Sequence, residues 1–133
     1  MTAAGRFGRF GLTGALGALL QVAVFDALVK GLHLPAVAAA PIAVELAVLH
    51  NFLWHERFTW VDRERGGLRQ RAARLWRFHA ANGLVSLAGN TALTWWLVER
   101  LQAPPGPSAL AAIAVCAPIN FWAADRWVWQ RRP

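Results

Sequence analysis

Cysteine is nearly absent from this sequence. Cys116 is the only one, so the chain cannot form a disulfide within itself, and its apolar neighbours indicate a packed small residue rather than a reactive thiol. Tyrosine is missing, and Asp and Glu together number only seven. The sequence contains no Gly-rich phosphate loop, no spaced set of Cys and His ligands and no nucleophile with a neighbouring base. We therefore expect no cofactor, no metal site and no enzymatic activity.

Apolar residues are what the chain has in abundance. They make up 56% of its 133 residues, which is more apolar surface than a soluble domain of this size can bury. Fourteen Lys and Arg against seven acids indicate an anionic partner: nucleic acid, anionic phospholipid or a phosphate-bearing substrate. Apolar segments of membrane-spanning length argue against nucleic acid.

Four apolar segments come close to the roughly 20 residues that cross a bilayer core. They cover about residues 10–29, 35–54, 78–98 and 108–122. The first also resembles a signal peptide cleaved near residues 36–38, but it is longer than an ordinary signal core. We therefore predict an all-α membrane protein in which residues 1–133 form one domain of four transmembrane helices.

The segment 61–76, between the second and third spans, is polar and rich in arginine. Leu68, Ala72 and Leu75 recur there at about helical spacing, on the side opposite the arginines. This pattern predicts a short amphipathic helix on the cytoplasmic membrane surface. Near the opposite boundary, we expect Asp26 to pair with Lys30 one helical turn later.

The distribution of charge predicts the orientation. With four spans, both termini and the segment 61–76 share one side of the membrane, and twelve of the fourteen basic residues lie on that side. Basic residues concentrate on the cytoplasmic side of membrane proteins. We therefore expect an inner-membrane protein with both termini in the cytoplasm.

An internal repeat organises the chain. Residues 51–60 and 120–129 share the pattern Asn-Phe-x-x-x-acid-Arg-aromatic-x-Trp, displaced by 69 positions. The same displacement relates two polar or small trios: Thr13, Gly17 and Gln21, and Asn82, Ser86 and Asn90. Each copy holds two spans, so both enter the membrane from the same side and form parallel repeats. In the first copy, Ala39, Ala43 and Ala47 form a small-residue face that another helix can approach closely.

Four arginines are expected at the cytoplasmic ends of the spans: Arg9, Arg57, Arg77 and Arg126. Two interpretations stay open for them. They are interfacial anchors beside an aromatic belt, or their guanidinium groups converge on a phosphate. The belt is expected to contain Trp54, Trp60, Trp127 and Trp129.

Glu45 is an acid at the middle of the second span, roughly 15 Å deep at 1.5 Å per residue. A carboxylate there costs on the order of 3 kcal/mol, and such residues usually face a bundle interior or a polar path. We predict a polar groove for a hydroxylated headgroup, lined by Glu45, Asn51, Asn82, Asn90, Asn120 and Gln21. The alternative is that these groups hold helices together without any ligand.

Taken together, these motifs resemble the GtrA-like family of small four-span membrane proteins. The matching features are the Arg-Phe pairs at residues 9–10 and 77–78, the segment 45–60, Asn82 and the segment 120–129. The resemblance implies translocation of a polyprenyl-phosphate-linked monosaccharide across the cytoplasmic membrane, for the synthesis of cell-surface polysaccharide. It equally admits an accessory subunit that anchors the glycosyltransferase.

A third interpretation is a small cation or drug exporter that uses Glu45, which the arginines disfavour. Four thin spans enclose little on their own, so we expect a homodimer or a larger assembly.

Overall fold

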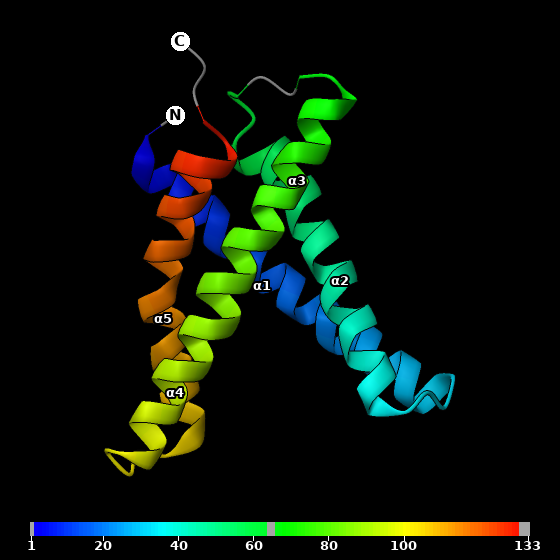
Figure 1. Cartoon of the computed structure of the whole chain (residues 1–133), viewed down its shortest axis with the longest axis vertical. Helices are drawn as coiled ribbons and strands as arrows, with labels where there is room; N and C mark the ends of the chain where they lie inside the picture. Colours follow the sequence, from blue (N-terminus) through cyan, green and yellow to red (C-terminus); the bar gives the residue numbers. More distant parts are fainter. Residues whose placement is uncertain (1, 64–65, 131–133) are drawn as a thin grey trace. The chain divides into compact units, whose positions relative to one another are not determined.

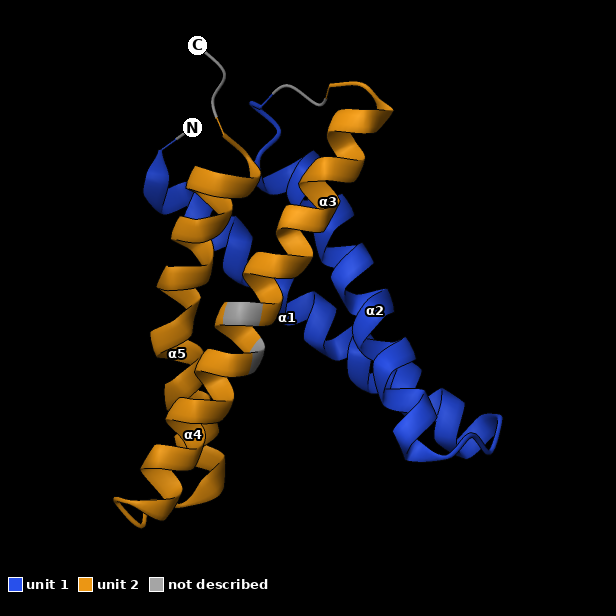
Figure 2. Cartoon of the chain, in the orientation of Figure 1, with its two compact units in different colours: residues 1–64 blue, residues 65–133 orange. Residues whose placement is uncertain are grey.

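The computed structural model describes residues 2–63 and 66–130, and these are helical with short connections. They contain no β-strand. The chain divides into two compact units, residues 1–64 and 65–133 (Figure 2). The division follows the repeat seen in the sequence, so each unit holds one copy.

The first unit is a pair of helices (Figure 1). Helix α1 (Ala3–Asp26) starts at Thr2, whose hydroxyl accepts a hydrogen bond from the Gly5 amide, and continues into the π-helical segment η1 (Ala27–Gly31). Helix α2 (Ala36–Trp54) begins after Pro35 and continues into the π-helical segment η2 (His55–Thr59). The expected ion pair between Lys30 and Asp26 is confirmed, at 2.6 Å.

Small side chains form the contact between α1 and α2. Ala39, Ala43 and Ala47, four residues apart on α2, are all buried, and Gly17 is buried on α1. This confirms the small-residue face read from the sequence. Because such side chains let two backbones come close, they gain dispersion contacts that bulkier side chains would prevent.

The second unit is also a helical hairpin, and its first helix is longer than its second. Helix α3 (Leu68–Asn82) follows Gly67 and runs through the π-helical segment η3 (Gly83–Gly89) into α4 (Asn90–Glu99). Helix α5 (Pro105–Ala123) returns and ends in the π-helical segment η4 (Ala124–Val128). Its buried small residues are Ser108, Ala112 and Cys116, each 69 positions after one of the three alanines on α2.

The structure joins two elements that the sequence pattern had separated. The amphipathic segment expected as its own helix within 61–76 is the first part of a helix that reaches Glu99. Gly83 has φ −62° and ψ −46°, and Gly89 has φ −64° and ψ −51°, so both glycines keep helical geometry and no break occurs. The third helix therefore begins at Leu68, well before the predicted start of its span.

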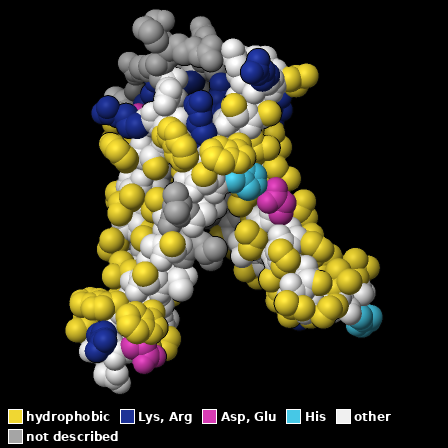
Figure 3. Space-filling view, viewed as in Figure 1, with side chains coloured by type: hydrophobic (Ala, Val, Ile, Leu, Met, Phe, Trp, Pro, Cys, Tyr) yellow, Lys and Arg dark blue, Asp and Glu magenta, His cyan; other side chains and the backbone are white. Residues whose placement is uncertain are grey.

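Three helices in the described parts of the chain are long and apolar enough to cross a membrane: Ala3–Gly31, Ala36–Thr59 and Pro105–Val128. The helix from Leu68 to Glu99 is not among them, and its first part carries four arginines. Apolar side chains cover much of the visible surface of each unit (Figure 3). Surfaces of this kind face lipid in membrane proteins.

Gly17 gives a direct test of the close contact in the first unit. An added Cβ at Gly17 would overlap the amide of Asn51, whereas one at Gly14 would meet nothing within 4 Å. We expect Gly17→Ala to lower the free energy of unfolding by about 1–3 kcal/mol. Gly14→Ala, on the same helix, should raise it by up to about 1 kcal/mol. Unfolding of the purified variants in bicelles, followed by circular dichroism, measures both values, and equal effects would contradict the packing.

Candidate functional site

The two copies of the repeated motif adopt the same backbone. Segments η2 and η4 are π-helical, and each is closed by a hydrogen bond from the amide of the following tryptophan. The Trp60 amide donates to the His55 carbonyl at 2.8 Å, and the Trp129 amide donates to the Ala124 carbonyl at 2.9 Å. π-Helical turns of this kind are rare and are often found at functional sites. The sequence repeat is therefore a repeat of one helix ending.

A buried tryptophan packs at the end of each of these two π-helical segments. The side chains of Trp60 and Trp129 are 0% and 1% exposed. The Phe10 ring of α1 meets the Trp60 ring edge-on at 6.0 Å, and the Phe78 ring of α3 meets the Trp129 ring in the same manner at 5.4 Å. In each unit, an aromatic residue of the first helix thus packs on the tryptophan that ends the second.

The four tryptophans of the predicted aromatic belt differ in exposure. Trp54 and Trp127 are 47% and 38% exposed, which suits interfacial anchors. Trp60 and Trp129 are buried instead, because the π-helical turn directs each of them toward the first helix of its own unit. They are packing residues of the helix endings.

Trp60 and Trp54 offer a matched comparison of a buried and an exposed tryptophan. We expect Trp60→Ala to destabilise the protein by about 3–5 kcal/mol, because it leaves a cavity beside Phe10. Trp54→Ala should cost about 1 kcal/mol or less. Unfolding in bicelles measures both changes. A Trp60→Ala variant as stable as Trp54→Ala would show that Trp60 does not seal the end of the unit.

Arg57 and Arg126 occupy equivalent positions in η2 and η4, and both side chains are exposed. Among the described residues, neither side chain forms a hydrogen bond or an ion pair with another residue, and the same holds for the half-buried Arg77 on α3. The acid that precedes each exposed arginine is less exposed: Glu56 is buried and Asp125 is half-buried, and both have interaction partners. Each ending therefore presents one guanidinium group outward.

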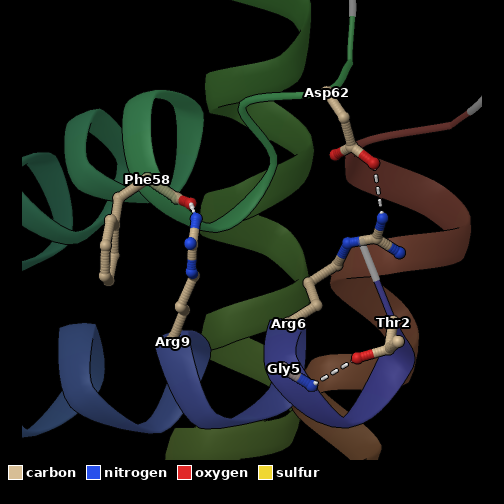
Figure 4. Close-up of polar contacts among 6 residues, drawn as sticks. All are labelled: Thr2, Gly5, Arg6, Arg9, Phe58 and Asp62. Atoms are coloured by element: carbon tan, nitrogen blue, oxygen red, sulfur yellow. Dashed lines mark hydrogen bonds and ion pairs between the residues drawn. The ribbon is translucent and has the colours of Figure 1, made fainter.

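Arg9, the first of the four predicted phosphate-binding arginines, is engaged within its own unit. Its Nη1 donates to the carbonyl oxygen of Phe58 at 2.9 Å, and its guanidinium carbon lies 4.7 Å from the centroid of the Phe58 ring (Figure 4). Both contacts reach from α1 to η2. Arg9 thus differs from Arg57, which is exposed one position before Phe58.

The predicted groove amides lie where the two helices of each unit meet. Asn51 is half-buried, and its amide occupies the space beside Gly17. At the equivalent level of the second unit, the Asn120 side-chain amide donates from Nδ2 to the Ser86 hydroxyl at 2.7 Å, and that hydroxyl donates to the side-chain Oδ1 of Asn82 at 3.2 Å. The Asn120–Ser86 bond joins α5 to η3, whereas the Ser86–Asn82 bond lies within the continuous helix α3–η3.

The remaining groove residues lie apart from these contacts. Glu45 is on an exposed face of α2, away from the alanines that pack on α1, and it has interaction partners of its own. Gln21 is exposed on α1, and Asn90 is half-buried at the start of α4. The described residues contain no group of three or more His, Cys, Asp or Glu side chains that could hold a metal ion.

The family comparison covers both endings and all four predicted arginines. The model of the GtrA/DPMS transmembrane domain matches residues 9–129. The chain belongs to this family. No curated protein matches the sequence significantly. Together with the three long apolar helices, membership of the GtrA/DPMS family identifies the chain as an integral membrane protein.

An ion pair at the start of α1 was missed by sequence reasoning. Arg6 lies before the residues that match the GtrA/DPMS family, is buried, and donates from Nη2 to the Asp62 carboxylate at 2.7 Å (Figure 4). A signal was present, because the pattern Arg-x-x-Arg-Phe occurs at residues 6–10 and again at 74–78. The repeated pattern therefore includes Arg6 as well as Arg9.

The electrostatics of the pair favour an ionised Asp62. Partial burial raises the pKa of Asp62, but the charge of Arg6, a backbone hydrogen bond, the hydrogen bond from Arg6 and the charge of Arg63 together outweigh it. The pKa of this carboxyl therefore lies below its ordinary value of 3.8. The charge on Asp62 offsets the cost of burying the Arg6 guanidinium.

This pair predicts a pH dependence of stability. Because the folded pKa of Asp62 is depressed, its contribution is complete above the unfolded pKa of about 4 and is lost as the pH falls through the lower folded value. Asp62→Asn should remove that acid step and cost about 1–2 kcal/mol at neutral pH, since Arg6 stays buried. The control is Asp26→Asn, which breaks an exposed pair and should cost about 0.5 kcal/mol or less. Unfolding measured from pH 3 to 7 tests this, and an unchanged acid step in Asp62→Asn would contradict it.

Proposed function

We propose that this GtrA/DPMS-family protein moves a polyprenyl-phosphate-linked monosaccharide across the cytoplasmic membrane, and that Arg57 and Arg126 bind its phosphate. The observation that carries the proposal is that both arginines are exposed at equivalent positions of two helix endings that share the same π-helical form. Family membership supports the substrate class. Nothing in the chemistry of these arginines calls for a cofactor or for an enzymatic step.

The chemistry of a helix end explains why arginine is needed there. The last carbonyl groups of a helix carry partial negative charge and repel an anion. A guanidinium group placed on the same turn reverses the sign of the local potential and offers two parallel N–H groups to phosphate oxygens. Arg77 supplies a further cation without a side-chain partner among the described residues. Anionic phospholipid headgroups would compete for the same groups.

The sugar and the polyprenyl tail place further demands on the protein. A hydroxylated headgroup needs amide or carboxylate partners along its path, and we assign that role to Gln21, Glu45, Asn51, Asn82, Asn90 and Asn120. The tail remains in lipid. We further propose an inner-membrane protein in which the helix from Leu68 to Glu99 completes four spans, with both termini cytoplasmic, assembled as a homodimer or a larger oligomer.

A second candidate is an accessory subunit that anchors a glycosyltransferase. One feature favours it: the first part of α3 is basic, and its apolar residues Leu68 and Trp76 are 83% and 69% exposed. Such a face can bind a partner protein. For the cation exporter, by contrast, the outward guanidinium groups at both helix endings are unfavourable.

Substitution of the two exposed arginines tests the proposal. In proteoliposomes that contain a polyprenyl-phosphate sugar, we expect Arg57→Ala and Arg126→Ala each to slow lipid-sugar translocation about tenfold or more. This is the loss of one charge-assisted hydrogen bond, about 1.5–3 kcal/mol. Both variants should insert and fold normally, because each side chain is exposed.

Lys30→Ala is the matched control, since it removes an exposed cation from the other end of the first unit. It should translocate at the wild-type rate. Wild-type rates in both arginine variants would rule out the phosphate role. A wild-type protein that moves no lipid-sugar but co-purifies with a glycosyltransferase would favour the accessory subunit.

A further inference from the structure

Arg9 and Phe10 are consecutive residues of α1, and both contact the π-helical ending of α2. The Arg9 guanidinium donates a hydrogen bond to the carbonyl oxygen of Phe58 and lies over the Phe58 ring. Phe10 stacks on the His55 ring at 4.9 Å and meets the Trp60 ring edge-on. The His55 ring is itself within hydrogen-bond distance, 3.0 Å, of the Thr59 hydroxyl. These contacts bracket Arg57, two residues after His55 and one residue before Phe58.

The Arg9 contact fits the needs of a helix end. Phe58 lies in the last turn, where backbone carbonyl groups have no partner within the helix. Such groups favour a cation, and Arg9 supplies one from the neighbouring helix. The ring of Phe58 covers one region of the guanidinium group, and the carbonyl oxygen occupies its Nη1. This bond uses one of the five N–H groups of the guanidinium, and together with the ring contact it ties the Arg9 side chain to η2.

The second unit does not reproduce the arrangement. The position equivalent to Phe58 is Trp127, and Arg77 opens the second unit as Arg9 opens the first. Among the described residues, the side chain of Arg77 forms no hydrogen bond, ion pair or ring contact. The contact is therefore a property of one unit rather than of the repeat.

We propose that Arg9 is a positioning residue: it fixes the ending of α2 so that Arg57 is held toward the phosphate, and it does not bind the phosphate itself. This rests on the proposed phosphate role of Arg57. It reassigns Arg9, which the sequence pattern placed among the phosphate-binding arginines. Its consequence is that Arg9 affects ligand affinity only through Arg57.

A double-mutant cycle distinguishes a positioning residue from a direct contact, because two residues that act through one another do not give additive losses. The probe is undecaprenyl phosphate without sugar, titrated into the full-length protein in nanodiscs of zwitterionic lipid. We expect Arg57→Ala to weaken binding about tenfold or more and Arg9→Ala about threefold to tenfold. The double variant should bind no more weakly than Arg57→Ala.

Three outcomes would overturn the proposal. A double variant weaker than Arg57→Ala by the full factor of Arg9→Ala would make Arg9 a direct contact and leave the phosphate role of Arg57 standing. Wild-type affinity in Arg9→Ala would remove any role for Arg9. Wild-type affinity in Arg57→Ala would overturn the proposed phosphate role as well as the positioning role.

Phe58→Leu keeps the test decisive if Arg9→Ala folds poorly. It removes the ring beneath Arg9 but changes no charge, and the backbone carbonyl stays in place. It should weaken binding about twofold to fourfold in the wild-type background and have no effect in the Arg57→Ala background. A direct Arg9–phosphate contact predicts wild-type affinity for Phe58→Leu, and that result would contradict the proposal.

Discussion

The close approach of two helices through small side chains is the contact on which each unit depends. In lipid, apolar surface gains little by leaving its surroundings, so helices associate through fit. Ala39, Ala43 and Ala47 supply that fit in the first unit. Ser108, Ala112 and Cys116 supply it in the second unit. The large aromatic rings are kept to the ends, where Trp60 and Trp129 pack on the first helix of their units.

The two copies share their helix packing but differ in some ion pairs and polar contacts. Three features recur with the same displacement: the π-helical endings, the buried small residues of α2 and α5, and an asparagine between the helices, Asn51 or Asn120. The Arg6–Asp62 pair does not, because the residue at the position equivalent to Asp62 is Arg131. The Arg9–Phe58 contact also belongs to one unit. The two copies therefore share a backbone frame but differ in the ion pairs and contacts of their first helices.

Much of the fold followed from residue patterns, because apolar length and small-residue spacing are local properties. They predicted helices near the observed ones and the face on which α1 and α2 meet. They did not predict that the third helix continues through Gly83 and Gly89, since glycine is compatible with both a break and a helix.

The candidate site was predicted less completely. The pattern predicted one group of four arginines, and it gave no sign that Arg9 contacts Phe58, 49 positions along the chain, whereas Arg57 and Arg126 are exposed. It placed Trp60 and Trp129 at the membrane interface because tryptophan is common there. Whether such a ring turns inward depends on the π-helical turn, which no composition signal marks.

The π-helical endings have a consequence for how the chain tolerates insertions and deletions. A π turn contains one residue more than the α turn it replaces. Because each π residue advances by a smaller angle than an α residue, a five-residue π turn covers about the same angle as four residues of an α-helix. The π winding of residues 55–59 therefore accommodates one extra residue while the Trp60 ring still meets the Phe10 ring. Loss of one residue from 55–59 would preserve that contact only where the segment rewinds as an α-helix, and the same reasoning applies to residues 124–128.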